Sequence, residues 1–161
     1  MLRTLSAAYT GSHSSVSIAP DGAWIARTVS LWDTVSGGRI RVLSGRRAPV
    51  DTIAAAPDGS WLVCSGADGT VRVWDPGSGL CLRTLVVPAG GRVPSVAASP
   101  DSRWIATAGH DATLRIWEAA TGRPVACVGV EDRLEACVWH SDGVGVTAAD
   151  AGGLFCFSFR A

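Results

Sequence analysis

The sequence predicts an all-β fold made of four repeated units of short strands, and three observations lead to that prediction. A turn aspartate recurs at a spacing near forty residues, and these aspartates are Asp21, Asp58, Asp101 and Asp142. An aromatic residue that ends a predicted strand recurs in phase with them, as Trp32, Trp74, Trp117 and Phe157. The segments between the turns are rich in β-branched and aromatic residues, which suit a pleated, half-buried surface.

The clearest unit runs from Pro57 to Gly79. Strands are predicted over Ser60–Ser65 and Thr70–Asp75, with a hairpin turn between them, because Gly, Pro and Asp supply the backbone angles and local hydrogen bonds of tight turns. Residues 100–122 repeat this unit almost position for position, residues 20–37 repeat it with a gap, and residues 141–158 repeat it loosely. A period near forty with strands as the predicted elements is typical of propeller blades.

The strand-ending pairs Trp32-Asp33, Trp74-Asp75 and Trp117-Glu118 each follow a Pro-Asp-Gly or Pro-Asp-Ser turn. This pattern resembles the WD-repeat β-propeller family. The resemblance implies about four blades of four antiparallel strands, with the innermost strand of each blade next to a central channel. It extends to the C-terminal repeat array of bacterial WD-repeat signalling proteins, in which the array follows a nucleotide-binding switch or a kinase.

We expect one domain over residues 1–161. Its units cover about 14–44, 50–86, 93–130 and 134–160, with an additional N-terminal strand at 2–7. The strands expected in these units are Ser14–Ala19, Ala23–Ala26, Thr28–Asp33 and Ile40–Leu43; Thr52–Ala56, Ser60–Ser65, Thr70–Asp75 and Leu80–Val86; Ser95–Ser99, Arg103–Ala108, Thr113–Glu118 and Pro124–Val128; and Leu134–Trp139, Val144–Ala149 and Gly153–Phe159. The spacing of the tryptophans indicates that the first unit is short. Trp24 and Trp32 are closer in sequence than Trp61 and Trp74 or Trp104 and Trp117, the matching pairs of the next two units.

The chain begins with an outer-type strand and ends one strand short. An unpaired sheet edge exposes backbone hydrogen-bonding groups, and closing the array removes that edge. We therefore predict that Leu2–Ala7 pairs with Gly153–Phe159. A tight four-blade ring, an open arc that associates with another arc, and a fragment of a longer parent all remain open; the small residues Ala54, Ala55, Ala97 and Ala98 on the inner strands favour the tight ring.

Three tryptophans, Trp32, Trp74 and Trp117, are expected to pack between blades. In the family this Trp joins a hydrogen-bonded group with a Ser or Thr, a His and an Asp. Trp74, Ser65 and Asp68 match in the second unit, with Arg46 at the His position. In the third unit Trp117 and Asp111 match, whereas Ala89 and Ala108 replace the His and the Ser.

Composition limits the partners and the compartment. The chain carries 14 basic residues, all Arg, and 14 acidic ones, so its formal net charge is zero and offers no general attraction to nucleic acid or to a membrane. Five cysteines lie inside predicted strands without a CxxC pair, which favours buried free thiols in a reducing compartment over disulfides. Residues 1–15 lack a signal-peptide core, and we expect a cytoplasmic protein.

The sequence carries no pattern that indicates catalysis. Nine of the 14 acidic residues fall at repeated turn positions, His13, His110 and His140 follow no metal-ligand spacing and are expected to be exposed loop residues, and the glycines lie in hairpins rather than at helix starts. We expect no cofactor, no metal and no enzymatic activity. The alternative is a propeller-scaffold enzyme of the lactonase or quinoprotein kind, with its site in the central channel. The inner strands, however, offer mainly Ile18, Ile53, Ala55, Val96 and Cys137 to such a channel.

Recognition by a surface is the remaining function, so we expect a non-catalytic scaffold or sensor for signal transduction. In the family, one face carries the loops that enter the inner strands and the middle hairpins. Five cations are expected there: Arg46, Arg47, Arg92, His110 and Arg133. Because Arg pairs bidentately with carboxylates, this set predicts a protein or acidic-peptide partner. Self-association is expected if the ring is open.

Overall fold

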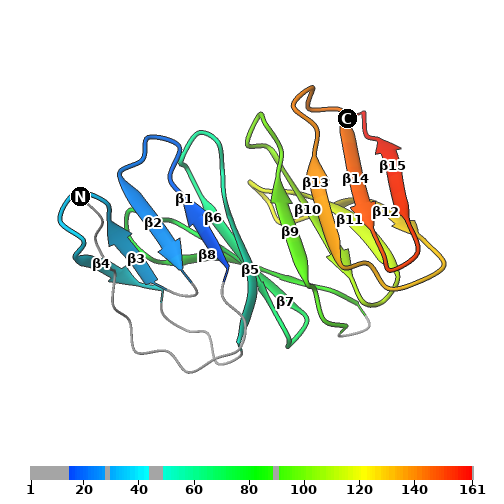
Figure 1. Cartoon of the computed structure of the whole chain (residues 1–161), viewed down its shortest axis with the longest axis horizontal. Helices are drawn as coiled ribbons and strands as arrows, with labels where there is room; N and C mark the ends of the chain where they lie inside the picture. The colour runs from blue at the N-terminus through cyan, green and yellow to red at the C-terminus, as the bar shows by residue number, and fades with distance from the viewer. Residues whose placement is uncertain (1–14, 28–29, 44–48, 89–90, 161) are drawn as a thin grey trace.

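The computed structural model describes residues 15–27, 30–43, 49–88 and 91–160, and within them it contains four antiparallel sheets and no helix. The sheets stand next to one another in chain order (Figure 1). Blade 1 contains β1 (Val16–Ile18), β2 (Trp24–Arg27), β3 (Ser30–Asp33) and β4 (Arg39–Val42). Blade 2 contains β5 (Val50–Ala55), β6 (Leu62–Gly66), β7 (Thr70–Trp74) and β8 (Cys81–Val86). Blade 3 contains β9 (Ser95–Ala98), β10 (Trp104–Gly109), β11 (Thr113–Glu118) and β12 (Pro124–Gly129), and blade 4 contains β13 (Ala136–Trp139), β14 (Gly145–Ala149) and β15 (Leu154–Ser158).

The all-β prediction is therefore confirmed, and so are the strands predicted within the described residues, whose ends differ by no more than two residues. The short first unit is confirmed as well: β2 and β3 have four residues each, whereas β6, β7, β10 and β11 have five or six. The expected strand Leu2–Ala7 lies outside the described residues. Its pairing with the last sheet remains a prediction.

The turns between the inner two strands of each blade show why the aspartates recur. Asp58 Oδ1 accepts the backbone N–H of Ser60 at 2.9 Å, and the other three turn aspartates accept from the residue two positions on in the same way. The next turn residue adopts the left-handed conformation, with φ +75° at Gly59. Ser102 takes the same conformation in blade 3, with φ 60°, although it has a side chain.

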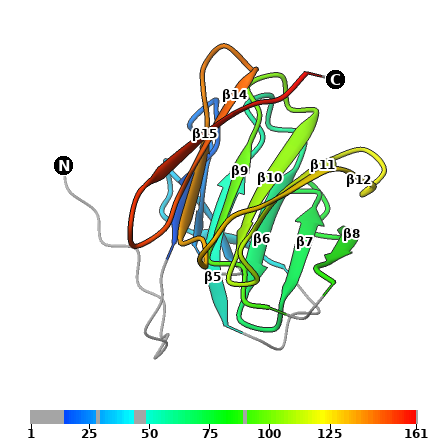
Figure 2. The same ribbon diagram turned by 90° about the vertical axis from the view of Figure 1, so that its right-hand side faces the viewer.

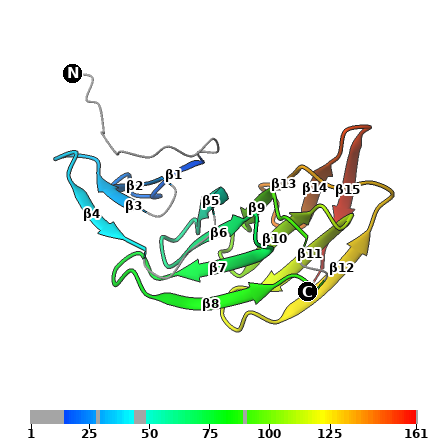
Figure 3. The same ribbon diagram turned by 90° about the horizontal axis from the view of Figure 1, so that it is seen from below.

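The four blades form an open arc rather than a ring (Figure 3). The inner strands β1, β5, β9 and β13 lie on the concave side, and the outer strands β4, β8 and β12 lie on the convex side. The alternative of a tight four-blade ring is therefore wrong. The small inner-strand residues that favoured it serve another purpose: they are half-buried against the hydrophobic clusters between neighbouring blades, namely Ala54, Ala55, Ala97 and Ala98.

The core lies between blades, where the sheets overlap one behind another (Figure 2). Blades 1 and 2 share a cluster that contains Leu31 and Trp74, blades 2 and 3 share one that contains Val71 and Trp117, and a third cluster joins blades 3 and 4. Each blade therefore depends on its neighbours for burial of its apolar faces, as repeat arrays do.

Two of the three tryptophans that were expected to pack between blades do so. Trp74 and Trp117 are buried against the preceding blade, and Phe157 is half-buried against blade 3. The clusters between the described blades do not contain Trp32, so its expected packing between two blades remains a prediction. Trp32 is buried, but it pairs with Ile25, one position out of phase with Leu31 and Ala26, which face blade 2. Because successive strand residues alternate in direction, Trp32 lies on the opposite face of blade 1.

Candidate interaction surface

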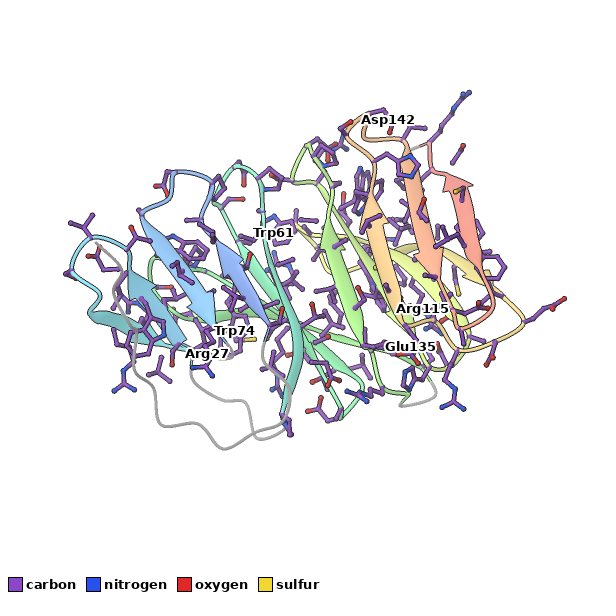
Figure 4. The ribbon with its side chains drawn as sticks, in the orientation of Figure 1. Arg27, Trp61, Trp74, Arg115, Glu135 and Asp142 are labelled. Carbon is purple, nitrogen blue, oxygen red and sulfur yellow. The ribbon has the colours of Figure 1, made fainter. Side chains whose placement is uncertain are left out.

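One edge of the arc gathers the charged residues that the sequence singled out. We define the loop face as the segments that lead into β5, β9 and β13 together with the β6–β7 and β10–β11 hairpin turns. Arg115 and Glu135 lie on this side of the molecule, at the lower edge of Figure 4, whereas Asp142 lies at the opposite edge. The β-strands run between the two edges, so every second connection returns to the loop face.

Arg92, in the segment before β9, is bound to Asp51 on β5. Its Nε and Nη2 donate to the two carboxylate oxygens of Asp51 at 2.9 and 2.8 Å, a bidentate arrangement. The Asp51 side chain is 3% exposed and that of Arg92 is 36% exposed. The hydrogen bonds that the Arg92 guanidinium donates to Asp51 raise its pKa above the ordinary value. Arg92 therefore fastens blade 3 to blade 2 and already has a carboxylate partner.

His110 makes the corresponding contact between blades 3 and 4. Its Nε2 is buried and lies 3.1 Å from Oε1 of Glu135, in the segment that leads into β13. Its backbone N–H donates to the carbonyl oxygen of Arg92 at 2.9 Å. The expectation of an exposed loop histidine is wrong for this residue, because the incoming segment of the next blade covers the ring.

Asp111 is paired within its own hairpin. Arg115 Nη1 donates to Asp111 Oδ2 at 2.7 Å, and the hydroxyl of Thr113 donates to Oδ1 at 2.6 Å. Both charged side chains of the Asp111–Arg115 pair are largely buried. Burial raises the pKa of Asp111, but the hydrogen bonds from Thr113 and Arg115 outweigh that effect and hold it below its ordinary value.

Among its described residues, the loop face therefore carries carboxylates as well as cations. Of the five predicted cations, Arg92 is paired with Asp51, His110 lies beside Glu135 without a hydrogen bond at its Nε2, and Arg46 and Arg47 lie outside the described residues. Arg133 is the exposed one, with its Nε 4.0 Å from Oδ1 of the equally exposed Asp132. The sequence analysis did not single out Asp51, Glu135 or Arg115. A usable signal existed for Arg115, because it stands four positions after Asp111 on one hairpin.

The hydrogen bonds of the strand-ending tryptophans differ from those expected. Trp74 Nε1 donates to Cys64 Sγ at 3.3 Å, and not to Ser65, whose hydroxyl donates to the Val93 carbonyl of the next blade at 2.6 Å. Trp117 Nε1 donates to Thr107 Oγ1 at 2.9 Å. The expected partners were misplaced by one residue because adjacent positions on a strand point to opposite faces. Ser65 and Asp68 remain structural, since the Asp68 carboxylate accepts from the N–H and hydroxyl of Thr70.

The remaining acidic turn residues also have local partners. Asp33, Asp75 and Glu118 each accept a hydrogen bond from a residue two or three positions on. Within the described part of the chain, no group of three His, Cys, Asp or Glu side chains could hold a metal ion. The described residues also include no helix long and apolar enough to cross a membrane.

The cysteines are not uniformly buried, which corrects the expectation from sequence. Cys64 and Cys137 are buried, whereas Cys81, Cys127 and Cys156 are exposed. Burial raises the pKa of the Cys137 thiol to about 11. The inner-strand residues Ile53, Val96 and Cys137 do not line a channel either, because they lie in the hydrophobic clusters between blades.

Comparison with known families agrees with this architecture. The family model described as WD domain, G-beta repeat matches residues 37–75 and 79–118. The chain belongs to the WD-repeat family. Each matched segment begins near the last strand of one blade and continues into the next blade. The first segment ends at Trp74-Asp75 of blade 2, and the second ends at Trp117-Glu118 of blade 3.

Several WD-repeat relatives are similar over one or two units. An uncharacterized WD repeat-containing protein of Synechocystis is 35% identical over 75 residues, which cover 44% of this chain and 22% of that protein. The transcription initiation factor TFIID subunit 5 of Caenorhabditis elegans is 37% identical over 49 residues, which cover 30% of this chain and 8% of the factor. The nuclear distribution protein PAC1 of Arthroderma otae is also 37% identical over 49 residues, 30% of this chain and 11% of that protein. The matched part of this chain therefore spans less than a quarter of each relative.

Proposed function

We propose that this WD-repeat chain is a non-catalytic scaffold or sensor that binds a protein partner on its loop face. One observation carries the proposal: the acidic groups described above have structural partners in turns and between blades. They therefore do not form a reactive cluster, and binding by the surface is the function that we infer. WD-repeat relatives with roles in multi-protein assemblies, such as a TFIID subunit, support the same function. A role as the sensor end of a bacterial signalling protein belongs to this proposal too.

An acidic peptide segment is the partner that we propose for the loop face. Arg133 supports it, because its side chain is 64% exposed and its contact with Asp132 is long and solvated, which makes that ion pair weak. Arg46 and Arg47 belong to the proposed set by sequence. Arg92 does not, because a partner carboxylate would have to displace the buried Asp51.

Binding of labelled peptides tests this proposal. We expect a peptide rich in Glu and Asp to bind more tightly than a neutral peptide of equal length. The triple variant Arg46→Glu, Arg47→Glu and Arg133→Glu should weaken that binding by about tenfold or more, because it reverses three charges at the contact. The matched control is Arg123→Glu, an exposed Arg in the β11–β12 turn at the opposite edge. Equal binding by the triple variant and the control would overturn the acidic-peptide proposal.

A cytoplasmic location and self-association complete the proposal. The exposed thiols of Cys81, Cys127 and Cys156 support the location, because exposed free thiols persist in reducing compartments. The uncovered faces at the two ends of the arc support self-association. Fractionation of cells that express the tagged chain tests the location.

A further inference from the structure

The two end blades each present one apolar face that no described blade covers. On blade 1 this face carries Val16 and Ile18 of β1, and both are exposed. They alternate with Ser17, whose hydroxyl accepts the N–H of Ala55 in blade 2, so Val16 and Ile18 point away from blade 2. We call this the leading face of blade 1.

The register of the strands shows that this face matches the faces by which blades 2 and 3 contact their preceding blades. Val16 occupies the position of Ile53 in blade 2 and of Val96 in blade 3. These two counterparts are 5% and 6% exposed because each packs against the preceding blade, whereas Val16 is 57% exposed. Trp32 likewise occupies the position of the interblade Trp74, and it is 8% exposed, so the uncovered part of this face lies at β1. The leading face therefore keeps the residue types of a blade contact without a blade against it.

Blade 4 presents the complementary face, which we call its trailing face. Leu154 on β15 occupies the position of Val71 in blade 2 and Leu114 in blade 3, both of which pack against the following blade. Leu114 is 3% exposed and Leu154 is 74% exposed. Val138 on β13 lies on the same face and is also exposed. A leucine and a valine exposed on the side where a next blade would sit indicate an unmade blade contact.

We propose that a second copy of this chain covers both faces, so that blade 1 of each copy packs against blade 4 of the other. The inference rests on the self-association in the proposed function and specifies its surface and stoichiometry. The two contacts are identical and related by a two-fold axis, as in a closed dimer. Two arcs of four blades make eight, which is within the range of four to eight blades in which propellers close.

A second copy fits better than an unrelated partner because this chain carries both halves of the contact. The two faces are at opposite ends of the arc (Figure 3), so one molecule does not join them as it stands. Their centres are apolar and therefore do not repel each other. At their loop-face ends, Arg27 closes β2 of blade 1 and Asp150 follows β14 of blade 4, which places opposite charges at the same level of the contact.

The mass of the full chain in solution is the primary test. We expect light scattering after size exclusion to give about 33 kDa, twice the 16.6 kDa of one chain, and a shift toward the single-chain mass on roughly hundredfold dilution. A single-chain mass at every concentration would overturn the proposal, and so would an open series of three or more chains. This measurement needs no variant, so failure of a variant to fold cannot obscure it.

Two double variants then locate the contact. A leading-face variant (Val16→Asp, Ile18→Asp) and a trailing-face variant (Val138→Asp, Leu154→Asp) should each raise the dimer dissociation constant by about 100-fold or more, because a buried unpaired carboxylate is costly. Leu80→Asp, at an exposed leucine in the β7–β8 turn, is the matched control and should leave the mass unchanged.

Mixing the two double variants is the decisive step. One contact is then intact, between the blade 1 face of the trailing-face variant and the blade 4 face of the leading-face variant, so mixed pairs should form although neither variant pairs alone. If the trailing-face variant pairs with itself, blade 1 contacts blade 1 and the proposed arrangement is wrong. The peptide-binding experiment measures a different quantity. The acidic-peptide proposal can therefore fail while the proposed dimer is confirmed.

Discussion

Replacing Trp74 with Ala should disrupt the contact between blades 1 and 2. Trp74 is fully buried in the cluster that these blades share, and its indole N–H donates to Cys64 Sγ. An aromatic side chain buries about 150–250 Å². At roughly 25 cal/mol per Å² that area corresponds to about 4–6 kcal/mol, and Trp→Ala substitutions in cores cost about 3–5 kcal/mol. Since small proteins are stable by only about 5–15 kcal/mol, we expect Trp74→Ala to be largely insoluble.

The assay is the soluble yield together with urea unfolding followed by circular dichroism. Trp74→Phe is the control, because it keeps most of the buried area and loses the hydrogen bond to sulfur; we expect it to remain soluble with a loss of about 1–2 kcal/mol. A soluble Trp74→Ala variant with the unfolding midpoint of the unchanged protein would refute the packing argument. If Phe and Ala were equally damaging, the loss would come from the hydrogen bond to Cys64 within blade 2, and not from the area buried between the two blades.

Three further predictions concern single contacts. Arg92→Ala leaves the nearly buried Asp51 carboxylate without its partner and should lower the free energy of unfolding by about 2–4 kcal/mol, measured in urea, whereas Arg123→Ala should change it by less than about 0.5 kcal/mol. Ala112 has φ 60°, so Ala112→Gly should raise the melting temperature through a gain of about 0.5–1 kcal/mol, and a lower melting temperature would show that the left-handed backbone is not strained. The pKa of Asp111 is lowered in the folded chain from its usual 3.8. Its contribution to stability is therefore complete above about pH 4 and is lost as the pH falls through the pKa that Asp111 has in the folded chain. The melting temperatures of the parent and of Asp111→Asn should become equal in acid.

The repeat could be recognised from the sequence because it depends on local interactions. The turn aspartates, the glycines with positive φ and the β-branched segments are each determined by residues only a few positions apart, and for that reason the strands were predicted to within two residues. The same locality explains the errors. Which of two neighbouring strand residues meets the Trp74 indole depends on which way each side chain points relative to the next strand, and the assignment to Ser65 rather than Cys64 was wrong by one position.

The candidate site shows a similar division. The sequence placed Arg92, His110 and Arg133 on one face, because the loops that carry them recur in phase with the blades. It could not show that Asp51 of blade 2 pairs with Arg92, or that Glu135 lies beside His110, because these contacts join residues of different blades. A cation counted in sequence is available to a partner only if no residue distant in the chain has paired with it.

By itself, then, the sequence determined the strand content, the number of units, the turn positions and the membership of each unit in a blade. Only the tertiary structure decided that the four blades leave an open arc, that Asp51 pairs with Arg92 on the loop face, and that Val16 and Leu154 are exposed while their counterparts are buried. The physical reason is that the first set of properties follows from backbone geometry within a unit. The second set depends on the angle and contact between units, which sum over many weak interactions among residues about forty positions apart.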